Sequence, residues 1–247
     1  MTQSKLNIIE TPDGSATLQK ADTAISFRSI KGAATESRHV FVGGSQITKK
    51  SGHWRVLELG LGTGLNLAKT VEAFLNSPKA SQLTYTAIEC SPLEAARFEQ
   101  LGQINDPTDG LSTQLILDAL QTPTKPKTVV RAQPKRIEFN LIPSKWQDHE
   151  AASLEVDAYY HDPFAPNDNP LCWTTNCFNW AKYHLGQTGI LVTYSAASAI
   201  RKAMAQAGLF IAKREGACGK REMTLAAIRP ELLESGKLLP TSKQPAQ

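Results

Sequence analysis

One carboxylate in this sequence stands where a side chain is expected to do chemistry. Asp162 follows the apolar run VDAYYH, which has the length and composition of a buried strand, and precedes the proline-rich loop PFAPNDNP. A buried charge is costly unless it has partners. A carboxylate there can orient an amine and accept its proton, since an alkylamine with a pKa of about 10.4 is mostly protonated in water. The alternative is that Asp162 caps the following turn, and His161 is expected to pack at the strand end.

A glycine-rich turn is the second feature with chemical meaning. The segment ELGLGTGLN spans Glu58 to Asn66 and connects an apolar run to a stretch with helical spacing. It departs from the dinucleotide fingerprint GxGxxG, because Gly64 comes one residue early and Leu65 follows it. An E-x-G-x-G-x-G turn after a first strand is typical of S-adenosyl-L-methionine sites, where glycines let the backbone approach the ligand. Glu89, which ends the next expected strand, can accept both ribose hydroxyls. The alternative is a structural turn and a surface glutamate.

These residues need elements that bring them together. Hydrophobic patterning predicts five strands with helices between them, at residues 55–60, 83–89, 137–142, 156–162 and 189–194. The sequence SPLE at residues 91–94 predicts a capped helix start. Such alternation indicates a mostly parallel sheet with helices on both faces, which binds ligands at the carboxyl ends of its strands. Two further runs around a basic glycine loop predict a C-terminal antiparallel hairpin. The predicted fold is therefore α/β, with the doubly wound, Rossmann-like, seven-stranded sheet of class I methyltransferases.

The ends and the middle of the chain are expected to depart from this sheet. Residues 1–50 mix Thr, Ser and Gly with short β-prone pieces, which predicts a small β-rich N-terminal extension. The methyltransferase domain is expected over residues 51–230, with a Pro-, Thr- and Lys-rich insertion at about 105–136 that contains one short helix. Residues 231–247 are expected to form a flexible tail.

Composition narrows the class of protein. The chain has 247 residues, of which 41% are hydrophobic and 20% charged, as in an ordinary globular α/β domain. Its four cysteines form no CxxC pair and His ligands at zinc-like spacing are absent, which predicts free thiols in a reducing compartment and no metal site. Neither a signal-peptide pattern nor an apolar run of about 18 residues is present. We therefore expect a cytoplasmic protein that does not bind membranes.

Basic residues gather in two places although the net charge is only +4. Residues 125–136 contain five bases and no acid, and residues 201–221 contain six bases against the single Glu215. Such clusters are either solvated surface or contacts for the phosphate backbone of a nucleic acid.

Five segments together resemble one known family. They are ESRHVFVGG, LELGLGTGLN, DAYYHDPFAPNDNPLCWT, TYSAASAIRKAMAQAGL and GACGKREM. The chain is similar to the tRNA methyltransferases that complete 5-methylaminomethyl-(2-thio)uridine at the wobble position. That activity occurs as the N-terminal half of the bifunctional MnmC enzyme and as a stand-alone MnmD type, and the spelling HDPFAP is closer to the latter. The resemblance implies S-adenosyl-L-methionine-dependent N-methylation of 5-aminomethyl-(2-thio)uridine in tRNA.

The resemblance also assigns roles to residues. It places Asp162 at the transferring methyl group as the catalytic residue. It implies that the cofactor is held by Glu58, Gly60, Leu61, Gly62, Thr63, Gly64, Asn66, Glu89 and Cys90. Pro163 and Phe164 echo the Asp-Pro-Pro-Tyr loop of amino-group methyltransferases and are expected at the substrate. The anticodon stem-loop is expected to contact Arg201, Lys202, Lys220 and Arg221. The chain length leaves no room for an oxidase half, so a separate FAD-dependent oxidase is an expected partner in the pathway.

One part of the family pattern is missing, and two other functions stay open. The family has a Gly-Asp pair after the third strand, near the adenine, where this sequence reads NLIPSKWQDHE. Either Asp148 substitutes for that aspartate or the adenine is held by backbone alone. The alternatives are a methyltransferase or aminopropyltransferase acting on a small amine, and a non-catalytic RNA-binding protein with a vestigial pocket. Trp173 can stack on a base, but core packing is the favoured interpretation.

Overall fold

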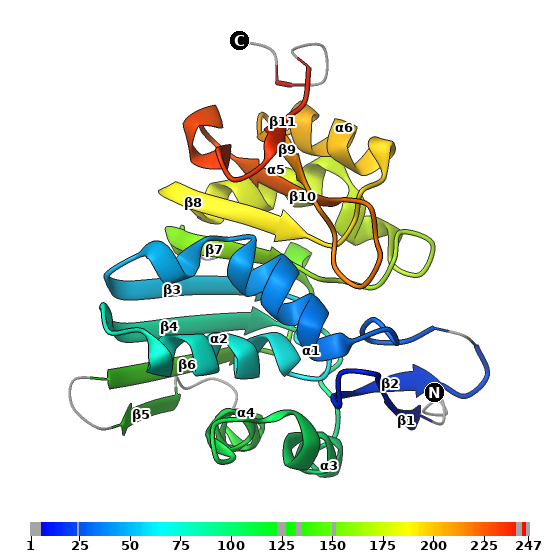
Figure 1. Cartoon of the computed structure of the whole chain (residues 1–247), viewed down its shortest axis with the longest axis vertical. Helices are drawn as coiled ribbons and strands as arrows, with labels where there is room; N and C mark the ends of the chain where they lie inside the picture. Colours follow the sequence, from blue (N-terminus) through cyan, green and yellow to red (C-terminus); the bar gives the residue numbers. More distant parts are fainter. Residues whose placement is uncertain are drawn as a thin grey trace.

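A nine-stranded sheet dominates the described part of the computed structural model (Figure 1). The structure describes residues 6–23, 25–122, 127–131, 135–149, 152–240 and 244–245. The strand order is β11-β9-β10-β8-β7-β3-β4-β6-β5. The bounds are Gly52–Leu59 (β3), Ala80–Ile88 (β4), Lys127–Arg131 (β5), Lys135–Ile142 (β6), Val156–His161 (β7), Leu185–Thr193 (β8), Phe210–Arg214 (β9), Met223–Ala227 (β10) and Lys237–Leu238 (β11). A separate two-stranded sheet pairs β1 (Leu6–Glu10) with β2 (Ala16–Lys20).

The central strands β8, β7, β3, β4 and β6 are parallel. β3 lies between β4, which follows it in the chain, and β7, which comes much later, so the strand order reverses beside β3. β10 lies antiparallel between β8 and β9. These pairings confirm the predicted class I methyltransferase fold and its C-terminal hairpin. The predicted number of seven strands is too low, because β5 and β11 add antiparallel edges beside β6 and β9.

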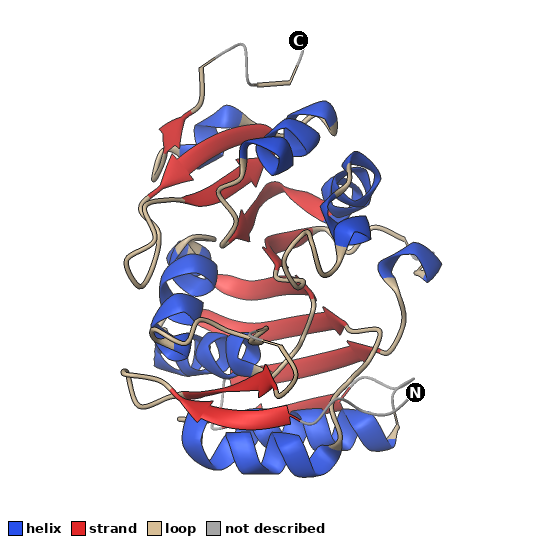
Figure 2. Ribbon diagram, turned by 90° about the vertical axis from the view of Figure 1, so that its right-hand side faces the viewer, coloured by secondary structure: helices blue, strands red, loops and turns tan. Residues whose placement is uncertain are grey.

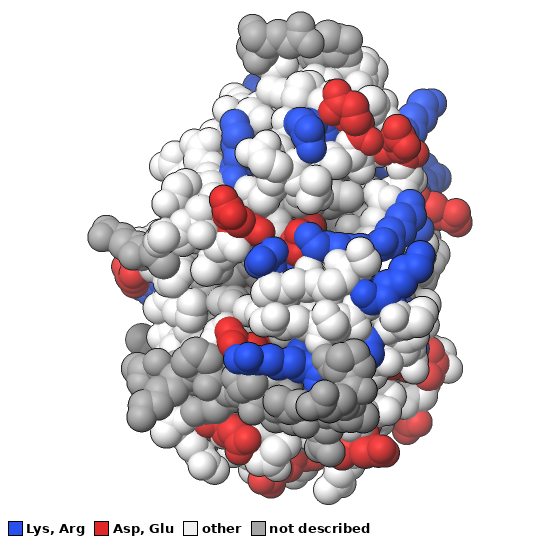
Figure 3. Space-filling view, turned by 90° about the vertical axis from the view of Figure 1, so that its left-hand side faces the viewer, with Lys and Arg blue, Asp and Glu red and all other residues white. Residues whose placement is uncertain are grey.

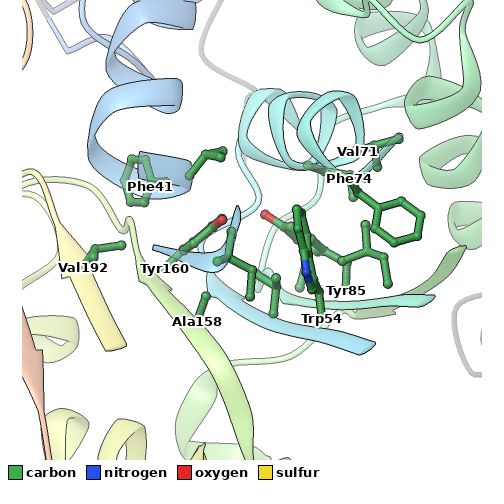
Figure 4. Close-up of a cluster of buried hydrophobic side chains, with 14 of the residues drawn as sticks. Phe41, Trp54, Val71, Phe74, Tyr85, Ala158, Tyr160 and Val192 are labelled. Atoms are coloured by element: carbon green, nitrogen blue, oxygen red, sulfur yellow. The ribbon is translucent and has the colours of Figure 1, made fainter. Parts of the chain in front are cut away.

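Helices cover both faces of the sheet (Figure 2). The α-helices are Ala33–Glu36 (α1), Leu65–Asn76 (α2), Ala95–Asn105 (α3), Leu111–Gln121 (α4), Thr175–His184 (α5) and Ser198–Gln206 (α6). Alternate strand residues enter two separate cores: Val56 packs with α2 and α4, whereas Leu57 packs with α5 and α6. In the first core Trp54 meets Phe74 edge to face at 5.6 Å between ring centroids (Figure 4). Burial on both faces fixes the sheet and therefore the positions of its strand ends.

The N-terminal region corrects the prediction of a β-rich extension. Its β1–β2 hairpin is present, but residues 33–43 and 47–49 are helical. They form α1, the π-helix η1 (Ser37–Gly43) and the 3-10 helix η2 (Ile47–Lys49). The β-prone residues Val40 and Phe41 are buried in the same core as α2. Packing against the sheet layer decides their conformation, because β-propensity depends strongly on context.

Three smaller predictions were also tested by the structure. Helix α3 begins at Ala95, and the backbone N–H of Ser91 donates to the Glu89 carboxylate instead of forming a capping box. The expected flexible tail is packed in its described part, where the 3-10 helix η5 (Pro230–Leu233) and β11 lie against β9 and Leu233 is fully buried. The insertion contains α4 and β5, and its most basic stretch lies largely outside the described side chains. No helix in the described ranges combines the length and apolarity needed to cross a membrane.

Candidate active site

The carboxyl ends of β4, β3 and β7 meet at one edge of the sheet. Backbone hydrogen bonds join the loops that follow these strands: Gly60 N–H to Ile88 O at 2.9 Å, Asp162 N–H to Leu59 O at 3.0 Å, and Glu89 N–H to Ile142 O at 3.1 Å. The glycine turn, the second-strand acid and the aspartate therefore lie side by side, as the topology rule for parallel sheets requires.

A cavity of about 640 Å³ opens at this edge. One wall consists of the strand-end loops, which include Gly60, Glu89 and Asp162, and another is residues 144–147 after β6. A third wall comes from the N-terminal region, which contributes Leu6, Lys20, Phe27 and Arg28. The volume falls in the range typical of small-molecule and cofactor sites.

The glycine turn and Glu89 have geometry that fits the binding of S-adenosyl-L-methionine. Gly60 has a φ of 92°, and a Cβ there would lie 2.8 Å from the backbone oxygen of Asp162, so only glycine allows the turn to touch the Asp162 loop. Glu89 accepts hydrogen bonds from the backbone N–H of Gly62 at 3.2 Å and of Ser91 at 2.9 Å. These bonds fix the carboxylate on the cavity wall, and each of its oxygens can accept a further bond from a ribose hydroxyl.

Asp162 belongs to a buried polar cluster that also contains Arg28, Glu58, Asn66 and Tyr85; we call it the carboxylate cluster. The Asn66 amide donates to Glu58 Oε1 at 2.7 Å and to Asp162 Oδ2 at 3.0 Å. Tyr85 donates its hydroxyl proton to Glu58 Oε2 at 2.8 Å. Arg28 forms ion pairs with Asp162 Oδ2 and, at 3.5 Å, with Glu58 Oε1. Two carboxylates therefore share one cation.

Burial sets the charge of Glu58. The side chain is fully buried, and this burial raises its pKa to about 7, although Arg28, Tyr85 and Asn66 favour the charged form. Glu58 therefore titrates near neutral pH, so that the net charge beside Asp162 changes there.

The loop after Asp162 is held by several side chains. Tyr194 donates to the Pro163 carbonyl at 2.9 Å, and Trp173 Nε1–H donates to the Phe164 carbonyl at 2.8 Å. The Phe164 ring meets Phe27 edge to face, with 4.9 Å between centroids. The loop is therefore a fixed platform on the cavity wall, and Trp173 packs in the core as expected.

The structure divides the predicted cofactor residues into two groups. Gly60, Gly62, Glu89 and Cys90 line the cavity. The other five lie behind it: Glu58, Leu61, Thr63, Gly64 and Asn66. Leu61 is fully buried, and Glu58 and Asn66 belong to the carboxylate cluster. The back of the turn therefore supports the site instead of lining it.

The predicted substrate residues also divide. Pro163 and Phe164 line the cavity, whereas the four basic residues near the C-terminus do not. The expected tRNA contact by Arg201 is wrong, because this side chain is buried and bound to Glu222 and Thr224 at 2.8 and 3.0 Å. Lys220 is half-exposed and pairs with Glu36 at 2.5 Å. Lys202 and Arg221 are exposed and keep their predicted role as an expectation.

The structure also shows where His161 and the segment after β6 lie. His161 is fully buried against Trp173 and Phe178, and burial lowers its pKa to about 3, so it is a neutral core residue as expected. Asp148 does not line the cavity, whereas Ser144 and Trp146 do. The Ser144 hydroxyl is buried and has no hydrogen-bond partner among the residues that the structure describes, so it is a better candidate than Asp148 for an adenine contact.

Sequence reasoning missed the N-terminal wall and, above all, Arg28. No motif marks it, since SFRS is an ordinary loop sequence and its acidic partners lie far along the chain. The available signal was weak: Arg28 is the only base between Lys20 and Lys31, in a stretch of small and apolar residues. Only the tertiary structure brings it to Asp162.

Comparisons with known proteins agree with this geometry. Residues 116–229 match a family described as S-adenosyl-L-methionine-dependent methyltransferase. A relative from Marinomonas sp. (strain MWYL1) is 30% identical over 203 residues, covering 78% of this chain and 30% of its own length. One from Paraburkholderia xenovorans is 28% identical, covering 83% and 32%. Both are named tRNA 5-methylaminomethyl-2-thiouridine biosynthesis bifunctional protein MnmC, and this chain spans about a third of their length.

Solved structures show the same fold. MnmC2 from Aquifex aeolicus aligns with a TM-score of 0.72 and 21% identity, covering 98% of this chain and 75% of that one. Spermidine synthase from Thermotoga maritima aligns with a TM-score of 0.57 and 12% identity, covering 94% and 72%. The fold, the glycine turn and the match over residues 116–229, a little under half of the chain, agree with an S-adenosyl-L-methionine-dependent methyltransferase. Its sequence is similar to the MnmC proteins, which confirms the resemblance seen in its motifs.

Proposed function

We propose that the chain methylates the exocyclic amine of 5-aminomethyl-(2-thio)uridine at the wobble position of tRNA, giving 5-methylaminomethyl-(2-thio)uridine. The observation that carries the proposal is the position of Asp162, a largely buried carboxylate on the wall of a cavity shared with the glycine turn and Glu89. The names of the MnmC relatives support this choice of nucleoside. A separate FAD-dependent oxidase in the same pathway stays a prediction.

The arrangement suits transfer of a methyl group to nitrogen. When bound, S-adenosyl-L-methionine supplies a methyl group whose C–S bond breaks as the C–N bond forms, with sulfur keeping the electron pair. The amine must offer its lone pair, so its neutral form is the reactive one. Asp162 orients this amine by a hydrogen bond and accepts the proton that the nitrogen loses.

The same cavity offers a surface for a nucleobase. Phe164 and Phe27 supply adjoining aromatic rings, and Lys20 Nζ lies 5.2 Å from the Phe164 centroid. Aromatic side chains stack on unpaired bases, and proteins that read RNA sequence favour splayed loop bases such as those of an anticodon. A wobble uridine therefore suits this pocket better than a base inside a duplex.

The test is methyl transfer to defined tRNA. The protein is incubated with isotope-labelled S-adenosyl-L-methionine and tRNA from cells lacking this methylation, and nucleosides are analysed by mass spectrometry. We expect label in 5-methylaminomethyl-(2-thio)uridine. Absence of label from the wobble nucleoside, with cofactor bound by calorimetry, rejects the substrate. Label on a polyamine, insensitive to ribonuclease, would instead establish the small-amine alternative.

Asp162→Asn examines the catalytic role. Asparagine keeps the shape but cannot accept the proton, so we expect a rate loss of roughly 100-fold or more with cofactor affinity within a factor of about three. Asp168→Asn is the matched control, because Asp168 is exposed on the same loop and does not line the cavity. Equal rates for both variants would remove Asp162 from the mechanism.

A further inference from the structure

Arg28 comes from outside the methyltransferase sheet yet is fixed at its active edge. Its side chain is only 2% exposed. The backbone N–H of Arg28 donates to Thr17 Oγ1 of the β1–β2 hairpin at 3.0 Å, and the guanidinium lies 5.5 Å from the centroid of the Phe41 ring of η1. Backbone and side chain are therefore both held by packing of the N-terminal region, before any ligand binds.

The guanidinium faces three ionisable groups from three strands. Its Nη1 pairs with Asp162 after β7, its Nη2 lies 3.5 Å from Glu58 Oε1 of β3, and Tyr85 of β4 donates to the other Glu58 oxygen, Oε2. Both contacts to Asp162, from Arg28 and from Asn66, are made with Oδ2. Among the described residues none donates to Oδ1, so the clamp occupies one carboxylate oxygen and leaves the other for a ligand.

We propose that Arg28 is the positioning residue for Asp162: together with Asn66 it holds Oδ2 and thereby presents Oδ1 to the substrate amine. This inference deepens the proposed function and rests on it. Arg28 also balances the charge of Asp162, so that the pocket does not trap the amine as an ammonium ion, which has no lone pair to react.

The fork of arginine is what the cluster requires. Two nitrogens of one planar group reach two carboxylates on neighbouring strands, a geometry that the single ammonium of lysine cannot reproduce. Arg28→Lys therefore keeps the charge but loses one contact, whereas Arg28→Met loses both. If Arg28 positions Asp162, the methyl-transfer rate must fall in the order wild type, Arg28→Lys, Arg28→Met.

The pH dependence separates positioning from a general loss of structure. Without Arg28, Asp162 and Glu58 lose their shared cation, and the pocket favours a protonated amine. The acid limb of the single-turnover rate, measured with saturating cofactor, should then move up by about one pH unit or more in Arg28→Met and less in Arg28→Lys. We expect a rate loss of roughly 100-fold for Arg28→Met at neutral pH. A purely structural role would lower the rate equally at every pH.

The full experiment compares these variants with Arg136→Met, which removes an exposed arginine paired with Glu138 at 3.7 Å, outside the cavity. If Arg28→Met does not fold, Arg28→Met/Glu58→Gln removes the uncompensated carboxylate as well. Crystal structures give a readout independent of activity: we expect Asp162 in a different rotamer in the Met variants. If the wild type methylates tRNA but Asp162 keeps its rotamer in Arg28→Met, or the acid limb does not shift, the inference about Arg28 is wrong and the proposed function stands. If the wild type does not methylate tRNA, the proposed function is rejected. The rotamer of Asp162 in Arg28→Met then decides by itself whether Arg28 positions Asp162.

Discussion

Glu58 is a fully buried acid whose ionisation affects the site from behind the cavity wall. It does not line the cavity, but it shares Arg28 and Asn66 with Asp162. Its carboxyl is protonated at mildly acidic pH and charged at alkaline pH, since its pKa is about 7. The electrostatic surroundings of Asp162 therefore change with pH.

The raised pKa of Glu58 predicts a loss of stability as pH increases. The ordinary value is 4.5 and the folded value about 7. Between these two values Glu58 loses its proton more readily in the unfolded chain than in the folded protein. The stabilisation that protonated Glu58 gives to the folded state is therefore fully present below pH 4.5 and is lost as pH rises through about 7. We expect the free energy of unfolding of the wild type, measured with urea, to decrease by on the order of 3 kcal/mol from pH 5 to pH 8, relative to the same change in Glu58→Gln.

Comparing the wild type with Glu58→Gln removes the effect of other titrating groups on the pH dependence of stability. Burial lowers the pKa of His161 to about 3 and that of His184 to about 4, and both histidines change stability with the opposite sign below pH 6.5. These contributions are common to both proteins. If the two proteins show parallel pH curves, Glu58 is not the buried acid described here.

At the scale of elements, the glycine turn can be tested by adding a single methyl group. Gly60→Ala places a Cβ 2.8 Å from the Asp162 carbonyl and strains a φ of 92°. Gly219→Ala strains a similar φ of 79° but meets no atom within 4 Å. We expect Gly60→Ala to weaken cofactor binding at least tenfold in calorimetry and Gly219→Ala to leave it unchanged. Equal affinities would mean that turn and loop are not in the contact described.

The sequence predicts the parallel core well because its strands carry strong local signals. The runs ending at Leu59, Ile88 and His161 are apolar, β-rich and bounded by turn residues, so each indicates a strand and a functional edge. Edges and caps are harder to predict. The segment HVFVGG looks β-prone, but it lies almost entirely in η1, which packs on α2, and β11 is only two residues long. Their conformations depend on neighbours distant in sequence.

In the candidate site, too, residues with a local sequence signal were predicted and residues that depend on distant contacts were not. Asp162 and Glu89 were found because each follows a recognisable strand, and Gly60 because turns of this kind need glycine. Arg28 was missed because it acts through contacts between distant segments, which leave no local pattern. Arg201 was misassigned for the related reason that charge in a sequence does not reveal burial.

At the scale of the whole molecule, basic side chains are not confined to the active edge. Figure 3 shows Lys and Arg side chains also on the face where β4 and β8 begin. A positive face alone therefore does not identify the tRNA-binding surface.

Under the proposed function, charge reversal at the two edges of the sheet tests where tRNA binds. Lys202→Glu with Arg221→Glu changes exposed residues near the C-terminal hairpin, whereas Lys49→Glu with Lys79→Glu changes residues just before β3 and β4. We expect only the first pair to weaken tRNA binding, at least tenfold, and to reduce the salt slope by about one per lost phosphate contact. Filter binding across salt concentrations measures both. The reverse pattern would place the RNA on the opposite edge.

The origin of Arg28 has a consequence for biosynthesis. Arg28 leaves the ribosome before any strand of the nine-stranded sheet, whereas Asp162 is synthesised only after β3, β4, β5, β6 and β7 have been made. The clamp therefore cannot close while the chain is short, since closing such a long loop costs entropy that only the finished sheet repays. The nascent protein should therefore acquire its sheet first and the contact between Arg28 and Asp162 last.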